Sequence, residues 1–204
     1  KNELQVWASM KEGITYIYRT KEILGALCLD MFAVLFGGAV AMIPVFASDI
    51  LKVGADGFGL LNAASDIGSM MIIVTLSFIP LRKNQGKILI GVVAGFGLCI
   101  IGFGLSKLYW LSFLFLMLSG IFDGISVVIR GTIVQLKTPD HIRGRVMSAN
   151  SIFIMSSNEM GQFESGVAAK LLGVVRSVVF GGTMTVLIAL FVGKFVPKLR
   201  KMEY

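Results

Sequence analysis

Long apolar runs separated by short polar connections fill almost the whole chain. A helix needs about 20 mostly apolar residues to cross a hydrocarbon core about 30 Å thick. Six runs are long enough, and they lie near residues 23–46, 58–79, 88–105, 108–128, 146–172 and 174–196. The pattern therefore predicts an all-α membrane protein with six transmembrane helices.

The connections contain turn and breaker residues, at 54–57, 80–86 and 137–140, and all four prolines lie at or beyond the expected helix ends. Because proline breaks a helix interior, its position supports these boundaries. Before the first run, apolar and charged residues mix as in a helix lying on a membrane surface. We expect a cytosolic amphipathic segment at 1–20, a six-helix bundle at 21–200 and a cytosolic tail at 201–204.

Composition narrows the class of protein. Of the 204 residues, 55% are hydrophobic and 15% are charged, and the mean hydropathy is +0.82. Typical globular domains have about 45–50% apolar and about 25% charged residues. The sequence therefore disfavours a soluble domain, a disordered tail and a charged coiled coil. The two cysteines, Cys28 and Cys99, lie inside apolar runs and predict no disulfide framework.

The net charge of +7 comes from basic residues that gather on one side of the predicted topology. Six spans place both termini on that side, and the other side keeps only Lys52, Lys107, Lys170 and Arg176. Lysine and arginine mark cytoplasmic loops, so both termini are expected in the cytoplasm. The basic excess thus indicates topology and does not point to a nucleic-acid partner.

Carboxylates inside the apolar runs are the strongest functional signal, and they are Asp30, Asp66, Asp123, Glu159 and Glu164. A carboxylate in mid-membrane costs about 3 kcal/mol on insertion scales, so it normally faces protein or a water-filled cavity. The third and sixth runs contain none in their interiors, which predicts that they pack outside the other four. Because this order repeats after three spans, we expect two inverted three-helix repeats. The acids could alternatively be structural and join helices by hydrogen bonds.

Helical spacing places polar side chains together on single helix faces. Asn62 and Asp66 share a face of the second span, and Glu159 and Gln162 share a face of the fifth. These faces are expected to line the interior. The pair Gly120 and Gly124, at GxxxG spacing, is expected to allow close helix packing instead.

The fourth span combines an acid with a base. Asp123 and Arg130 lie about two turns apart on one face, which predicts an ion pair that is structural or locks a gate. No catalytic constellation accompanies them, and a single histidine, His141, cannot form a metal cluster. We therefore expect a non-enzymatic protein with no metal or cofactor.

Several stretches resemble the C-terminal half of major facilitator superfamily exporters, and within them the enterobactin-exporter-like branch. They are RGTIVQ at 130–135, TPDHIRGRV at 138–146, SSNEMGQFESG at 156–166 and LFGGAV at 35–40. The loop at 80–87 departs from the superfamily pattern because it lacks the acidic residue of the family's loop motif. The resemblance covers essentially the whole chain.

The resemblance implies that the spans correspond to helices seven to twelve of a twelve-helix transporter in a bacterial inner membrane. The segment 1–20 then belongs to the linker between two halves, and the N-terminal half is the partner. The chain begins at Lys1 and is expected to be part of a longer protein. The first, second, fourth and fifth spans of such a half line a central cavity. Asp140, Arg143 and Arg145 fall in a cytosolic loop motif.

We therefore expect the C-terminal half of a secondary exporter that exchanges a small amphipathic molecule, a siderophore or a drug, for protons. The candidate substrate and proton-coupling residues are Asp30, Asn62, Asp66, Asn158, Glu159 and Gln162. Among these, Glu159 and Asp66 are the preferred coupling acids. Two alternatives stay open, a lysophospholipid transporter and a membrane scaffold or sensor that does not transport.

Overall fold

The computed structural model describes residues 2–79, 81 and 83–196, and these residues form helices and short connections with no strand. The expected tail at 201–204 lies outside the described residues. In chain order the elements are α1 (Asn2–Arg19), α2 (Lys21–Phe36), η1 (Ala39–Met42), α3 (Ile43–Val45), η2 (Phe46–Ile50), α4 (Ala55–Phe78), α5 (Gln85–Leu105), α6 (Tyr109–Lys137), η3 (Asp140–Ile142), α7 (Arg143–Leu172) and α8 (Val174–Phe195).

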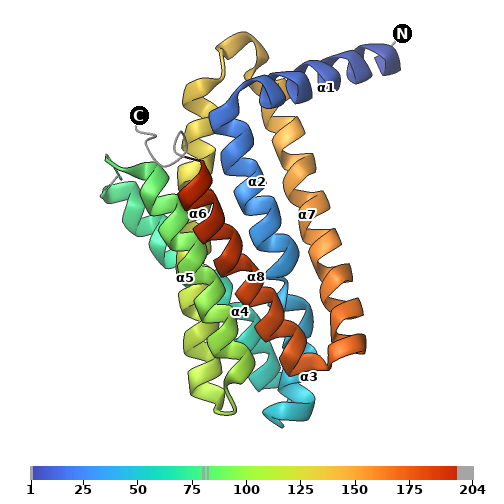
Figure 1. Ribbon diagram of the computed structural model, residues 1–204, viewed down its shortest axis with the longest axis vertical. Coiled ribbons are helices and arrows are strands. Elements are labelled where there is room, and N and C mark those ends of the chain that lie inside the picture. Colours follow the sequence, from blue (N-terminus) through green and yellow to red (C-terminus); the bar gives the residue numbers. More distant parts are fainter. Residues whose placement is uncertain (1, 80, 82, 197–204) are drawn as a thin grey trace.

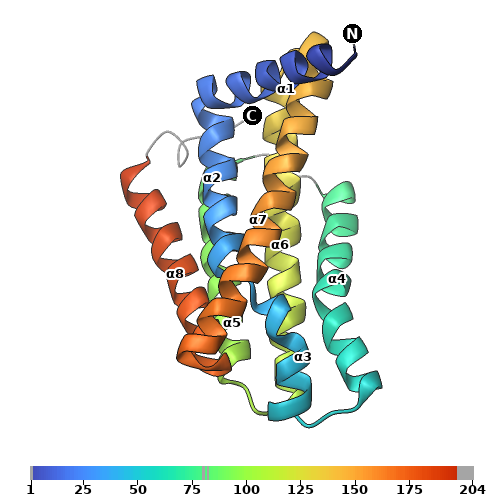
Figure 2. The same ribbon diagram turned by 90° about the vertical axis from the view of Figure 1, so that its right-hand side faces the viewer.

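The long helices run side by side as an elongated bundle, and α1 crosses one end of it (Figure 1). Helix α7 runs along α2 over much of its length, while α4 packs against α6 on the other side of the molecule (Figure 2). Helices α5 and α8 pack closely against each other. The first helix is anchored by Ile17, which is fully buried in the core between α2, α6 and α7.

Five segments of the described chain are long and apolar enough to cross a membrane, namely Lys21–Ile50, Ala55–Phe78, Gln85–Leu105, Tyr109–Lys137 and Val174–Phe195. They match five of the six spans that the sequence predicts. The fifth predicted span is α7, a helix of 30 residues that does not meet the same standard of hydropathy. Its middle part, residues 156–166, contains serine, asparagine, glutamate and glutamine.

The first apolar segment is broken beside Gly37 and Gly38. Helix α2 ends at Phe36, and a short 3₁₀ turn and a π-helical turn carry the chain on to Ile50. A broken helix in a membrane needs other groups to satisfy the freed carbonyls. The Thr185 hydroxyl on α8 is 3.2 Å from the carbonyl oxygen of Ala33 and donates to it. The same carbonyl also accepts from the Gly37 N–H at the end of α2, so the Thr185 hydroxyl adds a second hydrogen bond next to the break.

Small residues allow α4 and α6 to approach closely. A Cβ atom on Gly120 would lie 1.9 Å from the carbonyl oxygen of Ser65, and one on Gly68 would lie 2.0 Å from that of Met117. On Gly124 it would lie 2.5 Å from the side chain of Ile72. The expected packing role of Gly120 and Gly124 is confirmed, and Gly68 supplies the matching surface on α4.

Candidate functional site

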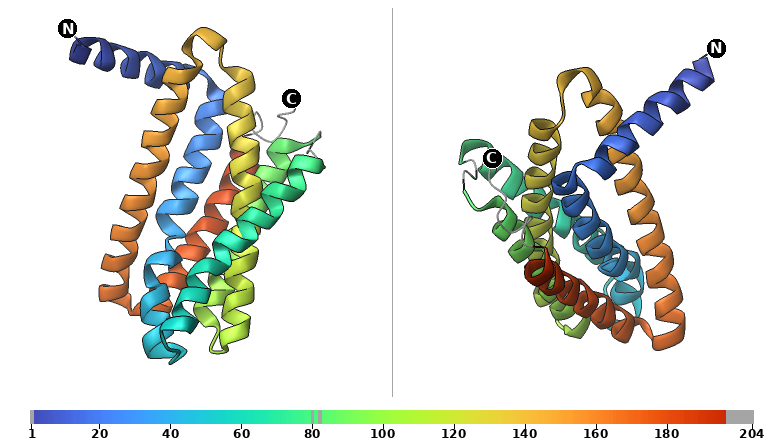
Figure 3. Two further views of the ribbon diagram at one scale, coloured as in Figure 1. Left: turned by 180° about the vertical axis from the view of Figure 1, so that it is seen from behind. Right: turned by 45° about the horizontal axis from the view of Figure 1, so that its top comes forward.

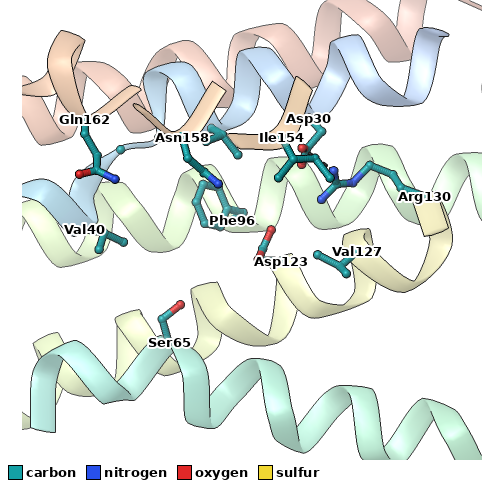
Figure 4. Close-up of a pocket in the computed structure, with 13 residues that line it drawn as sticks. Asp30, Val40, Ser65, Phe96, Asp123, Val127, Arg130, Ile154, Asn158 and Gln162 are labelled. Atoms are coloured by element: carbon teal, nitrogen blue, oxygen red, sulfur yellow. Dashed lines mark hydrogen bonds and ion pairs between the residues drawn. The ribbon is translucent and has the colours of Figure 1, made fainter. Parts of the chain in front are cut away.

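A cavity of about 250 Å³ lies between the broken first segment and helices α4, α5, α6 and α7 (Figure 4). Its lining combines charged, polar and apolar side chains with two backbone glycines. The lining residues are Asp30, Val34, Gly37, Gly38, Val40, Ser65, Phe96, Asp123, Val127, Arg130, Ile154, Asn158 and Gln162. We call this space the central cavity.

Arg130 and Asp30 form a buried ion pair at one end of the central cavity (Figure 4). The Arg130 Nη1 atom donates to Asp30 Oδ2, and each side chain is only 7% exposed. The Nε atom of Arg130 also lies 3.2 Å from the Ser126 hydroxyl oxygen, one turn earlier on α6. Two different groups therefore hold the guanidinium in place.

This pairing corrects the expected ion pair between Arg130 and Asp123. Seven residues on one helix are separated by about 10.5 Å along its axis. Helix α2 instead brings Asp30 alongside Arg130, so the arginine pairs between helices and not within α6. The sequence did not show this contact because it joins positions 100 residues apart.

Asp123 also faces the central cavity, close to Phe96 and Arg130 in Figure 4. Within the described part of the chain, its carboxylate forms no hydrogen bond and no ion pair with another side chain. Asp123 is only partly buried, and a carboxylate that faces a cavity in a membrane protein is usually compensated by a proton, a cation or water. Asp123 is therefore the carboxylate in the cavity that is free to bind a ligand or a proton.

Helix α7 contributes Asn158 and Gln162, two of the predicted residues, to the cavity wall. Glu159, the preferred coupling acid on this helix, does not line the cavity and is exposed. The face that meets the cavity has the spacing i and i+4, so the neighbouring Glu159 is turned by about 100°. Of the predicted face, Gln162 therefore lines the cavity and Glu159 does not.

Helix α4 shows the same shift. Ser65 lines the cavity, whereas Asn62 and Asp66 are exposed and lie outside the lining. The rotation of α4 is set by Ala64 and Gly68, which are buried against α6. The structure therefore does not bring Asp66 together with Asp30, Asp123 or Glu159.

The fifth intramembrane acid, Glu164, lies in a separate groove on the outer side of α7. This groove has a volume of about 520 Å³ and a mostly apolar wall that includes Leu35, Phe163 and Leu171. Glu164 is partly exposed there, away from the central cavity.

Two cavity features differ from the sequence-based expectation. The third predicted span was expected to pack outside, yet its helix α5 places Phe96 in the cavity wall. Gly37 and Gly38 form part of the wall because the first span is broken there. The paired glycines in LFGGAV were a signal for this break, since glycine is common where a helix ends.

The predicted loop-motif residues Asp140, Arg143 and Arg145 lie outside the central cavity. Asp140 pairs with Arg143 across one turn on the surface, and Arg145 pairs with Glu12 of α1. The Tyr16 hydroxyl donates to the Lys137 carbonyl oxygen. These contacts attach α1 to the ends of α6 and α7.

No group of three or more histidine, cysteine, aspartate or glutamate side chains in the described residues could hold a metal ion. The cavity instead offers one compensated carboxylate, one free carboxylate, two amides and an aromatic ring. Such a set can bind a polar or charged group and exchange a proton at a carboxylate.

A comparison with curated proteins finds no match for the chain. The sequence model of one protein family, described as a transmembrane secretion effector, matches residues 3–204. This match covers nearly the whole chain, including all the described helices except the first residue of α1. The chain therefore belongs to the transmembrane secretion effector family MFS_3, a transporter family of the major facilitator superfamily.

Proposed function

We propose that this chain is the C-terminal half of a secondary transporter that exports a small amphipathic molecule, a siderophore or a drug, in exchange for protons. The observation that carries the proposal is the free Asp123 carboxylate beside the compensated Asp30–Arg130 pair in one cavity. A carboxylate in this position can hold either a proton or a polar group of the substrate, which is the requirement for exchange.

The composition of the cavity wall supports an amphipathic substrate. Phe96, Val127 and Ile154 offer apolar surface, while Asn158 and Gln162 offer amide donors and acceptors. Binding sites for small molecules commonly combine an apolar wall with a few polar groups that fix orientation.

In the proposed cycle, Asp123 takes a proton from outside and loses it inside as the helices rock. Arg130 lies near both carboxylates, so its attraction to Asp123 is strongest when Asp123 is ionised. Loss or gain of one proton then changes how firmly α6 is held to α2 through Asp30. The pair formed by Arg130 and Asp30 serves as the lock.

The packing of the helices supports six spans arranged as two inverted repeats. Helices α4 and α5 both pack on α6, the first helix of the second set of three. In the same way, helices α7 and α8 both pack on α2, the first helix of the first set. In this arrangement α7 is a spanning helix whose polar side faces water in the cavity, which lowers its hydropathy. The missing wall of the cavity is supplied by the partner half, and both termini lie in the cytoplasm.

Export by the full protein in membrane vesicles, driven by a pH gradient, tests the proposal. Asp123→Asn removes the exchangeable proton at nearly constant shape, so export is expected to fall at least tenfold and to lose its dependence on the gradient. Asp56→Asn is the matched control because Asp56 is exposed at the start of α4, outside the cavity. This control is expected to export within twofold of the unchanged protein.

The same assay separates the remaining assignments. Asp66→Asn and Glu159→Gln test the acids that the sequence favours but that lie outside the cavity lining. Gradient-dependent export that survives Asp123→Asn and is lost in these two variants would assign the coupling to Asp66 and Glu159 and would overturn the role of Asp123. A folded full protein that moves none of a panel of siderophores, drugs and lysophospholipids would favour a scaffold.

A further inference from the structure

Helix α1 crosses the end of the bundle (Figure 3). A second recess lies beside it, separate from the central cavity. It has a volume of about 610 Å³ and lies between α1 and the connection from α6 to α7. Its lining includes Lys11, Thr15, Tyr16 and Arg19 of α1 with His141 and Ile142 of the connection. We call this recess the α1 hollow.

The charges around the α1 hollow leave two cations without a partner. Glu12 is engaged by Arg145, and Asp140 is engaged by Arg143. Neither Lys11 nor Arg19 forms an ion pair within the described part of the chain. Both are exposed and eight residues apart on α1, at its hollow-facing side. An anion that enters the hollow thus meets a lysine and an arginine.

Aromatic side chains beside these cations indicate the kind of anion. Trp7 is 70% exposed and Tyr18 is 58% exposed, and helical spacing puts both on the same side of α1 as Lys11. Exposed tryptophan and tyrosine are typical of the membrane–water interface, where one part of the ring is apolar and the other wet. Because α1 lies across the end of a membrane-spanning bundle, these rings are placed to meet lipid.

We propose that the α1 hollow binds the phosphate of an anionic phospholipid headgroup. Lys11 and Arg19 contact the phosphate, with His141 at the rim, and Trp7 and Tyr18 contact the adjoining lipid. Basic sites at the cytoplasmic ends of membrane helices bind anionic headgroups in this way. The site ties α1 to the bilayer, and it is separate from the central cavity.

Native mass spectrometry of the full protein in detergent tests the site by titration with phosphatidylglycerol. Loss of one cation near an anionic headgroup is expected to weaken binding about fivefold. Lys11→Gln with Arg19→Gln is therefore expected to raise the apparent Kd of the first bound lipid about 25-fold. The exchange Lys11→Arg with Arg19→Lys keeps both charges and is expected to stay within about threefold.

Lys107→Gln with Arg176→Gln is the matched control, because it removes one lysine and one arginine that are exposed at the opposite end of the bundle. It is expected to leave the apparent Kd within twofold. The proposal would be overturned by an equal loss in this control, by no loss in the Lys11 and Arg19 double variant, or by equally tight binding of phosphatidylcholine. Equally effective competition by inorganic phosphate would identify a site for a soluble anion and would also overturn it.

Discussion

At the scale of single residues, the buried Asp30–Arg130 pair is the feature whose disruption we expect to destabilise the fold most. Two charges buried together are compensated by each other, but removal of one leaves the other without a partner in an apolar surrounding. The Ser126 hydroxyl adds a second contact to the guanidinium. We therefore expect the stability of the fold to depend on having both partners of the pair, whatever their role in transport.

Arg130→Gln is expected to lower the free energy of unfolding by about 3–5 kcal/mol, because it strands the Asp30 carboxylate. Asp30→Asn combined with Arg130→Gln is expected to recover part of this loss, since no charge then remains. Chemical unfolding of the full protein in detergent measures both variants. Arg143→Gln, which opens the exposed pair with Asp140, serves as control and is expected to cost less than about 1 kcal/mol. A similar loss in both single arginine variants would contradict the expectation.

The sequence located the helices that carry the site better than the residues that face it. Each residue turns a helix by about 100°, so the side chain that reaches the cavity depends on how neighbouring helices fix the rotation. Asn158 and Gln162 face the cavity where Glu159 was favoured, and Ser65 does so in place of Asp66. Hydropathy alone cannot resolve such one-residue shifts when both sides of a helix carry polar groups.

At the scale of elements, hydrophobic length predicted most of the helices because a spanning helix must be long and apolar. Helix α7 is polar enough to fall below the hydropathy standard that the other five spans meet, although its apolar residues had predicted a span at 146–172. The break after Phe36 was also missed, because the apolar run continues without interruption through Gly37 and Gly38. The amino-acid composition of a segment predicts that it is buried in the membrane. It does not predict whether the segment forms one continuous helix.

Because α4 and α6 cross closely, the addition of a single methyl group at the crossing is expected to destabilise the protein. Gly120→Ala would place a Cβ atom 1.9 Å from the Ser65 carbonyl oxygen, a backbone atom that cannot rotate away. The helices must then separate, and the free energy of unfolding is expected to fall by about 1–3 kcal/mol. Gly131→Ala on the same helix meets no atom within 4 Å. Unfolding experiments are expected to show no loss for this control, and an equal loss in both variants would count against the close crossing.

At the scale of the whole molecule, the distribution of charge is asymmetric along the bundle. The α1 end carries the ion pairs of Glu12 and Asp140 and the free cations of the α1 hollow, while the opposite end carries few basic residues. By the positive-inside rule, this asymmetry supports the proposed orientation, in which α1 lies in the cytoplasm.

Thiol labelling of intact cells tests this orientation. In full protein without other cysteines, Lys107→Cys is expected to react with a membrane-impermeant reagent added outside, because this exposed position lies between α5 and α6 at the outer end. Lys11→Cys is expected to react only after the cells are opened. The reverse pattern would invert the proposed topology.

The break at Gly37 and Gly38 has a mechanical consequence for the cavity whose wall it forms. Bending a continuous helix in an apolar medium requires loss of backbone hydrogen bonds that are each worth about 4–6 kcal/mol there. The segment from Ala39 to Ile50 consists of short 3₁₀, α-helical and π-helical turns and no longer forms one continuous α-helix with α2. We therefore expect the part of the cavity wall formed by the first span to bend more easily than the parts formed by the continuous helices α6 and α7. In consequence, we expect a ligand that presses on the cavity to displace this wall before it bends α6 or α7.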